Sequence, residues 1–296
     1  MKILVTGCNG LLGQKLVALL SGMSDVSVVA TARSPLAGSW PVAFALLDIT
    51  DTKMVSDVVA QHRPDVIIHG AAMTQVDICE QDKDAAYKTN VVGTENIIEA
   101  ARQCNAHLVY VSTDFVFDGQ RGMLTEDEAP GPVNYYGETK LIAEQRVIES
   151  GLSWSIVRTV LVYGIIPGVL RSNILTWVKK SLEEGKRINV VNDQWRTPTL
   201  AEDLALGCYL AALKRAQGIY HISGKDYVSV YDIAVRTADY FNLDASQITP
   251  VPTSMLPQPA KRPAKTGFNI GKAERELGYA PHSLSEGIAI VAKQIE

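Results

Sequence analysis

The stretch KILVTGCNGLLGQKLVALL, residues 2–20, decides the fold. An apolar, β-branched run leads into a turn that contains Gly7, Gly10 and Gly13, and a helical pattern follows at once. Glycines in such a turn allow a tight bend and a close backbone approach to a ligand, while the N-terminus of the following helix offers free N–H groups to an anion. We therefore expect this turn to bind the pyrophosphate of a dinucleotide. A turn that merely joins a strand to a helix is the alternative.

Four further apolar runs repeat the pattern of the first strand. They are VSVVAT (26–31), DVIIHG (65–70), HLVYVS (107–112) and SWSIVR (153–158). Continuous β-branched runs are typical of strands that are buried on both faces of a sheet. Amphipathic helical patterns lie between them, at 11–22, 51–62, 84–104 and 135–150. The alternation predicts an α/β fold with a doubly wound parallel sheet of the Rossmann type.

The regular alternation ends after residue 158. A loop is expected at YGIIPG (163–168), followed by helices at 171–184 and 200–214 and a strand at GIYHIS (218–223) that completes the sheet. The remaining chain contains a proline-rich run and two short helical patterns. We expect an NAD(P)-binding domain of residues 1–165 plus about 193–222, and a smaller C-terminal substrate-binding domain of about 166–192 plus 223–296.

The composition excludes several classes of protein. The chain has 296 residues, of which 47% are hydrophobic and 20% charged, so it can bury the core of one large or two unequal domains. A net charge of −4 provides no basic stripe for nucleic acid. Cys8, Cys79, Cys104 and Cys208 are scattered and are expected to be reduced thiols, with no disulfide or zinc site. With no signal-like N-terminus and no apolar run of about eighteen residues, we expect a soluble, cytoplasmic protein without a membrane partner.

The residues after the second expected strand bear on the choice of dinucleotide. NAD usually calls for an acid there, which accepts hydrogen bonds from the ribose 2′-hydroxyl. The chain has TARS (31–34) at this end, and Asp25 lies at the opposite edge of the sheet. Arg33 offers a planar fork to a 2′-phosphate, so we favour NADP; a solvated loop arginine is the alternative and leaves NAD open. Asp48, with Ile49 beside it, is expected near the adenosine, although Asp48 could instead cap helix 51–62.

The motif NYYGETK (134–140) places two tyrosines near a lysine. At 100° per residue, Lys140 lies about 40° around the helix from Tyr136 and one turn along, but about 140° from Tyr135. A phenol is a poor acid at neutral pH, and a nearby cation stabilises its phenolate. Lys140 therefore makes Tyr136 a usable proton donor. The pair alone is weak evidence, since an exposed helix face produces the same spacing.

Two hydroxyl residues end the strand at 107–112. In STDFVFDG (112–119), Ser112 and Thr113 fall at the carboxyl edge of the sheet, where open α/β proteins bind their ligands. A hydroxyl at this edge can donate a hydrogen bond to a carbonyl oxygen beside the tyrosine. A cap or turn is the alternative role for such a pair.

Taken together, these motifs resemble the extended short-chain dehydrogenase/reductases. The resemblance covers nearly the whole chain and rests on GxxGxxG (7–13), HGAA (69–72), NVVGT (90–94), STDFVFDG (112–119), YGETK (136–140) and DQWRTPT (193–199). The last motif and KRP (261–263) resemble the members that reduce nucleotide sugars. The resemblance implies NAD(P)H-dependent reduction of a 4-keto nucleotide sugar, with a homodimer as an expected assembly.

The resemblance also implies roles for individual residues. Tyr136 would protonate the C4 oxygen, Lys140 would bind the nicotinamide ribose and lower the pKa of the tyrosine, and Thr113 would be the catalytic hydroxyl. Cofactor contacts are implied for Gly7, Asn9, Gly10, Leu11, Leu12, Gly13, Ala71, Ala72 and Asn90. Substrate contacts are implied for Thr74, Val76, Asp77, Asn173 and Arg196. Arg196 could bind a diphosphate or anchor the smaller domain, and His69 is expected to be structural.

The chain departs from the family pattern at one position of the expected sugar site. Leu161 in RTVLVYG stands where these reductases often have a tryptophan, and Trp195 could compensate or be a buried structural residue. No catalytic metal is expected. Two other functions remain open: an epimerase or dehydratase of the same fold, and a non-catalytic NADP-binding regulatory subunit. An intact Tyr136 and Lys140 argue against the latter.

Overall fold

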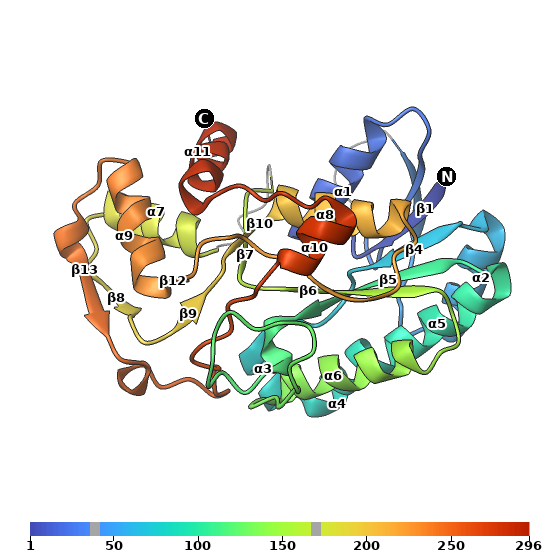
Figure 1. Cartoon of the computed structure of the whole chain (residues 1–296), viewed down its shortest axis with the longest axis horizontal. Coiled ribbons are helices and arrows are strands. Elements are labelled where there is room, and N and C mark those ends of the chain that lie inside the picture. Colours follow the sequence, from blue (N-terminus) through green and yellow to red (C-terminus); the bar gives the residue numbers. More distant parts are fainter. Residues whose placement is uncertain (36–41, 167–172, 296) are drawn as a thin grey trace.

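The computed structural model describes residues 1–35, 42–166 and 173–295, and its centre is a seven-stranded parallel sheet (Figure 1). The strands lie in the order β11-β6-β5-β4-β1-β2-β3. Their bounds are β1 (Lys2–Thr6), β2 (Ser27–Ala32), β3 (Ala43–Leu46), β4 (Val66–His69), β5 (His107–Thr113), β6 (Trp154–Thr159) and β11 (Gly218–His221). The chain winds outward from β1 first to one edge and then to the other, which confirms the predicted doubly wound fold.

Successive residues of the central strands face opposite sides of the sheet. Ile3 and Val5 pack in one hydrophobic cluster, and Leu4 packs in another. The first cluster is covered by α1 (Leu11–Ser21), α8 (Ala201–Leu213) and α10 (Gly271–Leu277). The second is covered by α2 (Thr52–His62), α5 (Gly93–Cys104) and α6 (Tyr135–Ile148). Burial on both faces explains why these strands are continuous apolar runs.

The expected helix at 84–104 is confirmed, and the short helix α3 (Val76–Gln81) precedes it. Within it, a π-helical turn (Lys88–Val92) lies between α4 (Lys83–Tyr87) and α5. Such turns are rare and often lie at functional sites. Here the turn contains Asn90, whose side chain is buried.

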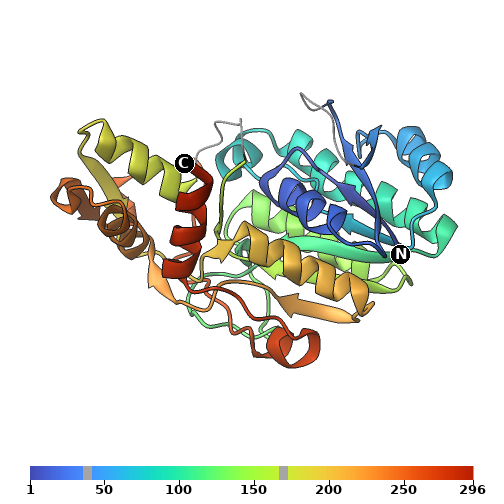
Figure 2. The same cartoon turned by 90° about the horizontal axis from the view of Figure 1, so that it is seen from above.

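The second part of the molecule lies beside the sheet rather than over it (Figures 1 and 2). It consists of helices α7, α9 and α11 with short strand pairs. The helices are α7 (Ile174–Glu183), α9 (Val230–Tyr240) and α11 (Leu284–Ile295). The strands are β7 (Val162–Tyr163), β8 (Ile188–Val191), β9 (Trp195–Arg196), β10 (Thr199–Leu200), β12 (Val228–Ser229) and β13 (Ile248–Val251). Strands pair as β10-β7, β12-β9 and β13-β8, so distant segments meet in each pair.

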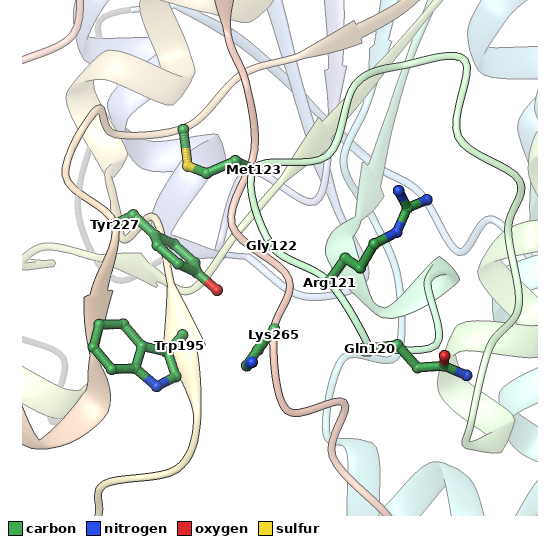
Figure 3. Close-up of a pocket in the computed structure, with 7 residues that line it drawn as sticks. All are labelled: Gln120, Arg121, Gly122, Met123, Trp195, Tyr227 and Lys265. Carbon is green, nitrogen blue, oxygen red and sulfur yellow. The ribbon is translucent and has the colours of Figure 1, made fainter.

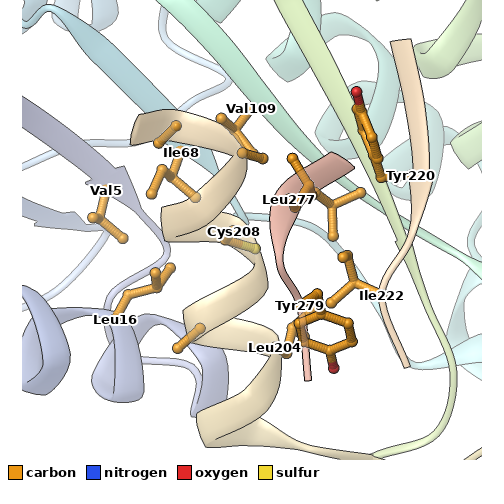
Figure 4. Packing of buried hydrophobic residues seen from close by; sticks show 14 of the residues in the cluster. Val5, Leu16, Ile68, Val109, Leu204, Cys208, Tyr220, Ile222, Leu277 and Tyr279 are labelled. Carbon is orange, nitrogen blue, oxygen red and sulfur yellow. The ribbon is translucent and has the colours of Figure 1, made fainter. Parts of the chain in front are cut away.

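The structure corrects the expected elements in several places. The edge strand β3 was not predicted, and the chain after 223 has three α-helices instead of two. Leu277 and Tyr279, which were expected in the smaller domain, pack with Leu204 and Cys208 of α8 in the cluster on the sheet (Figure 4). The end of the expected loop at 163–168 and the start of the expected helix at 171–184 lie outside the described residues. The division into two domains stays a prediction.

All four cysteines are free thiols. Across the described ranges, none of the helices combines the length and the apolar character needed to cross a membrane.

Gly13 tests how closely the first turn packs. A Cβ at this position would lie 2.4 Å from both the Cα of Cys8 and the carbonyl oxygen of Gly7, so backbone would have to move. We expect Gly13→Ala to lower the free energy of unfolding by about 1–3 kcal/mol or more in urea titrations. Gly22→Ala is the matched control, because its nearest neighbour is the Leu19 oxygen at 3.6 Å. Equal losses in both variants would contradict this account of the turn.

Candidate active site

A pocket of about 1130 Å³ lies at the carboxyl edge of the sheet, where the chain changes direction between β1 and β4. This is the position at which open α/β sheets bind ligands. The pocket extends from the glycine turn, past the ends of β4 and β5, to α7 and β8. All the site residues that the sequence predicted line this pocket, except Asp77, Asn90 and Lys140.

The glycine turn forms one wall of this pocket. Gly7 has φ +74°, and a Cβ on it would lie 2.9 Å from the Cα of Ala71, so the turn touches the backbone after β4. Gly10 is the N-cap of α1 and offers no side-chain cap. The first N–H groups of α1 therefore lack a side-chain partner and can bind an anion. The residues present fit a dinucleotide pyrophosphate.

Residues around the end of β2 line the same side of the pocket. Asn9 donates a hydrogen bond to the carbonyl oxygen of Ser34 at 3.0 Å. This bond connects the glycine turn to the loop that follows β2. Arg33 is exposed at the rim, where its guanidinium is available to a phosphate. Asp48 and Ile49 also line the pocket.

Asp48 does not cap a helix, because Asp51 is the N-cap of α2 and accepts a hydrogen bond from the Met54 amide. Asp48 instead accepts hydrogen bonds from the amide and hydroxyl of Thr50 at 2.9 and 2.8 Å. Burial acts to raise the pKa of Asp48, but the Thr50 hydrogen bonds and the charge of Arg33 lower it overall. The carboxylate is thus ionised and can accept hydrogen bonds.

Helix α6 places one of the two neighbouring tyrosines in the pocket. Tyr136 lines it and is 8% exposed, whereas Tyr135 lies outside it beneath the Lys83 ammonium. Lys140 is buried behind the pocket wall. Its Nζ donates to the Val111 carbonyl oxygen at 2.8 Å and lies 4.1 Å from the centre of the Tyr110 ring.

Burial dominates the ionisation of both groups. Burial raises the pKa of the Tyr136 phenol well above its ordinary value; a hydrogen bond with Thr113 opposes this, and Asp114 and Cys79 reinforce it. Burial lowers the pKa of Lys140 to about 7. The negative charge of Glu144 raises this pKa, but by less than burial lowers it. Lys140 is not among the groups that lower the pKa of Tyr136. The ammonium donates to the Val111 carbonyl oxygen, and the expected effect of Lys140 on the pKa of the tyrosine stays a prediction.

Hydroxyl groups at the end of β5 complete the reactive part of the pocket. Thr113 accepts a hydrogen bond from the Phe115 amide at 3.2 Å, and the Ser112 Oγ is buried without any hydrogen-bond partner. Both residues line the pocket. A buried hydroxyl without a partner is uncommon, which marks this strand end as a candidate for ligand contact.

A glycine allows α6 to approach this turn. A Cβ on Gly137 would lie 2.1 Å from the carbonyl oxygen of Phe115. The N-cap Asn134 accepts a hydrogen bond from the Gly137 amide at 2.9 Å and fixes the start of the helix. The rings of Phe115 and Tyr136 then meet edge to face, with centroids 5.9 Å apart.

The predicted substrate residues divide into two groups. Thr74 and Val76 line the pocket without a competing role in the hydrogen-bond network. Asn173 lines it as well, but its Oδ1 caps α7 and its Nδ2 donates to the Gly164 carbonyl oxygen at 2.5 Å. Arg196 is buried, and its two Nη atoms donate to Gln194 and to the carbonyl oxygens of residues 195, 263 and 264. These contacts favour the anchoring role for Arg196.

Several residues that line the pocket were not predicted from the sequence. Arg262 pairs with Asp77 through two bonds of 2.5 and 2.6 Å, and so joins α3 to the proline-rich run. Trp177 on α7 and Gln258 also line the pocket. A basic residue within KRP was the available signal for Arg262, whereas helical periodicity alone does not distinguish a pocket tryptophan from a core one.

Two of the predicted residues act behind the pocket wall. Asn90 accepts a hydrogen bond from the Met73 amide at 2.8 Å and donates to the Met73 carbonyl and the Thr139 hydroxyl, so it shapes the loop after β4. His69 shares hydrogen bonds with Thr6 and Thr94. Burial, followed by the charge of Lys140, lowers the pKa of His69 to about 3, which makes it a neutral structural residue.

Trp195 does not compensate for Leu161. Leu161 lines the pocket in the left-handed region, with φ +35°. Trp195 instead faces a separate shallow pocket with Tyr227 and Lys265, as Figure 3 shows. Its ring lies 5.5 Å from that of Tyr227.

Among the residues that the structure describes, no three His, Cys, Asp or Glu side chains come together in a way that could hold a metal ion.

This arrangement of glycine turn, strand-end hydroxyl and YxxxK helix is that of the extended short-chain dehydrogenase/reductases. The chain belongs to the RmlD substrate binding domain family, whose sequence profile matches residues 1–296.

This chain is similar to reductases and to a methionine adenosyltransferase subunit. The dTDP-4-keto-6-deoxy-D-glucose reductase of Streptomyces niveus is 33% identical over 283 residues, which cover 94% of this chain and 91% of the relative. Methionine adenosyltransferase 2 subunit beta of Rattus norvegicus is 31% identical over 278 residues, which cover 92% of this chain and 81% of the relative. The crystal structure of dTDP-4-dehydrorhamnose reductase from Bacillus anthracis, in complex with NADP, matches with a TM-score of 0.89 and 32% identity over 99% of both chains.

Lys140→Met tests whether the ammonium is buried. Folding lowers the pKa of Lys140 from 10.5 to about 7, so the unfolded chain binds more protons between these values. The lysine therefore destabilises the fold fully below pH 7, and the penalty shrinks as the pH rises, by up to about 1.4 kcal/mol per pH unit. The stability of Lys140→Met relative to wild type should be greatest near pH 6 and should decrease toward pH 9 in urea titrations of the ligand-free protein.

The exposed Lys53 provides the control for this test. Lys53→Met should show no comparable pH-dependent gain. A constant difference between Lys140→Met and wild type at both pH values would contradict the burial of a titrating ammonium.

Proposed function

We propose that this protein uses NADPH to reduce the 4-keto group of a nucleotide sugar, and that dTDP-4-dehydrorhamnose is its substrate. The observation that carries the proposal is one pocket that combines the glycine turn with the side chains of Tyr136, Thr113 and Ser112. Relatives and a solved structure that bear the names of such reductases support the same reaction. The pocket volume of about 1130 Å³ exceeds the ~300–1,000 Å³ typical of a single small ligand, which fits a cofactor and a substrate together.

The cofactor half of the pocket is proposed to act through backbone and charge. The uncapped N-terminus of α1 would bind the pyrophosphate, and Arg33 the 2′-phosphate of NADP. Asp48 would accept hydrogen bonds from the adenosine ribose, and Lys140 would bind the nicotinamide ribose as the family resemblance implies. Bound NADPH supplies the hydride to the carbonyl carbon.

The chain would supply the proton. Because burial raises its pKa, the phenol of Tyr136 keeps its proton at neutral pH and can transfer it to the carbonyl oxygen. Hydrogen bonds from Ser112 and Thr113 would stabilise the charge that develops on this oxygen. Both hydroxyls lie on the same strand end, so they are held by the sheet rather than by a mobile loop.

The substrate half of the pocket is proposed to involve Thr74, Val76 and Asn173. Neither arginine is assigned to the diphosphate, because the Nη donors of Arg196 bond carbonyl oxygens and those of Arg262 bond Asp77. In this proposal residues 1–165 and about 193–222 bind the cofactor, and most of the remaining chain binds the substrate. A homodimer stays a prediction.

A second function is favoured by one specific observation. Methionine adenosyltransferase 2 subunit beta is 31% identical to this chain over 92% of its length. A regulatory subunit of that kind would bind NADPH without turning it over. An assay that finds tight NADPH binding, no oxidation with 4-keto nucleotide sugars, and a complex with a methionine adenosyltransferase catalytic subunit would favour it over the reductase.

Tyr136→Phe tests the proposed acid. With dTDP-4-dehydrorhamnose as substrate, we expect the wild type to oxidise NADPH stoichiometrically, which an epimerase would not do. Loss of the phenolic proton should lower kcat by roughly 10²–10⁴-fold while NADPH still binds in fluorescence titrations. Tyr135→Phe is the matched control and should retain activity, since Tyr135 lies outside the pocket. Unchanged turnover in Tyr136→Phe would remove the tyrosine from the mechanism.

Arg33→Ala tests the choice of cofactor. Removing the guanidinium should raise the Kd of NADPH by about tenfold or more and leave the Kd of NADH nearly unchanged, because only NADPH carries the 2′-phosphate. Arg102→Ala, an exposed arginine on α5, should change neither value. Equal shifts for both cofactors in Arg33→Ala would be inconsistent with recognition of the phosphate.

A further inference from the structure

Asp114 is a buried carboxyl group that joins the reactive hydroxyls to the C-terminal half of the chain. It is 3% exposed and lines the pocket. Its Oδ1 accepts a hydrogen bond from Thr113 Oγ1 at 3.1 Å. Its Oδ2 accepts one from the Thr266 hydroxyl and lies 3.8 Å from Nε of Arg196. The carboxyl group is therefore fixed on both sides.

The hydrogen bonds of Thr113 can be accounted for completely. A hydroxyl has one hydrogen and two lone pairs. The Phe115 amide donates into one lone pair at 3.2 Å, and the hydrogen points to Asp114. The remaining lone pair is left for another donor, and Tyr136 lines the same pocket as Thr113.

The Phe115 amide, Thr113 and Asp114 form a hydrogen-bond chain whose Thr113–Asp114 link can run in two directions. When Asp114 is ionised it can only accept, so Thr113 must donate to it and its hydrogen is unavailable to a ligand oxygen. When Asp114 is protonated on Oδ1 it donates to Thr113, which frees the hydrogen of Thr113 for a ligand oxygen.

We propose that Asp114 is a positioning residue that sets the direction of the hydroxyl hydrogen of Thr113. The proposal rests on the proposed reduction for its kinetic consequence but not for the hydrogen-bond chain itself. Protonation of Asp114 would allow the Thr113 hydroxyl to donate to the carbonyl oxygen of the substrate, beside the Tyr136 phenol, and ionisation would withdraw this hydrogen.

The charges around Asp114 are few. Arg196 faces it from β9, and Tyr136 faces it from α6. Behind these two groups, Tyr227 faces Arg196 and the Cys79 thiol faces Tyr136. Burial raises the pKa of Asp114, and Arg196 and the hydroxyls of Thr266 and Thr113 oppose the rise. The titration of Asp114 is therefore expected above the ordinary range of an aspartate.

The first test needs no substrate. The pKa of Asp114 can be followed by ¹³C NMR of the carboxyl carbon in ligand-free wild type, assigned with Asp114→Asn. Thr113→Val removes a hydrogen bond to the ionised form, so the pKa of Asp114 should rise, whereas Thr113→Ser keeps the hydroxyl and should restore the wild-type value. An unchanged pKa in Thr113→Val would overturn the hydrogen-bond chain.

The second test is kinetic and uses NADPH with dTDP-4-dehydrorhamnose. In wild type, kcat should fall as the pH rises through the titration of Asp114. Asp114→Asn, whose amide always donates toward Thr113, should abolish this fall. The exposed Asp118 provides the matched control, and Asp118→Asn should retain the wild-type pH profile.

A double-mutant comparison separates positioning from a structural role. Thr113→Val should lower kcat by about 10²–10³-fold. If Asp114 acts through Thr113, adding Asp114→Asn to this variant should change kcat less than about twofold at any pH. An equal effect of Asp114→Asn in both backgrounds would overturn the proposal. If wild type does not oxidise NADPH with this substrate, the proposed function fails, while the NMR titration still decides on the chain.

Discussion

The close approach of two backbone turns determines the geometry of the whole site. Gly7, after β1, and Ala71, after β4, meet at the point where the sheet changes direction. Thr6 accepts a hydrogen bond from the Ala71 amide and shares another with the buried His69, so the two strand ends are fixed to each other. A side chain at position 7 would separate these turns. Because the floor of the pocket is made of backbone, its shape depends little on rotamers.

Burial controls the chemistry of the residues above that floor. Helix α6, which carries Tyr136 and Lys140, packs against strands β5 and β6, and both side chains are buried. Glu144, one turn further along, makes a two-bond ion pair with Arg158 of β6. Such a buried pair is costly to break, so it holds the helix in register with the sheet. Burial raises the pKa of the Tyr136 phenol and lowers the pKa of the Lys140 ammonium.

The sequence predicts those parts of the molecule that depend on local pattern. The glycine turn, the five inner strands and the Tyr136 face of α6 follow from spacing alone, because period and turn chemistry are local properties. The parallel, doubly wound arrangement of the sheet followed from the alternation of elements. Candidate pocket residues at strand ends could be found for the same reason, since the carboxyl ends of parallel strands share one edge.

The sequence does not predict features that arise from contacts between distant segments. Arg196 donates hydrogen bonds to carbonyl oxygens almost seventy residues further along the chain. The sequence alone therefore could not decide whether Arg196 anchors the smaller domain or binds a ligand. Arg262 reaches the pocket only because its partner Asp77 lies on α3. The edge strand β3 pairs on one side only and lacks a strong periodic signal. The hydrogen bonds of Asn90 to the Met73 backbone depend on the π-helical turn, which has no sequence pattern of its own.

Gly137 has a consequence for how such sites are recognised. A tyrosine and a lysine at this spacing occur by chance in many helices, but only a helix without a side chain at position 137 can come within contact distance of the Phe115 carbonyl oxygen. The residue that follows the tyrosine thus carries information that the reactive pair does not. A search that demands this small residue together with a strand-end hydroxyl would discard chance matches on physical grounds, without any comparison of whole sequences.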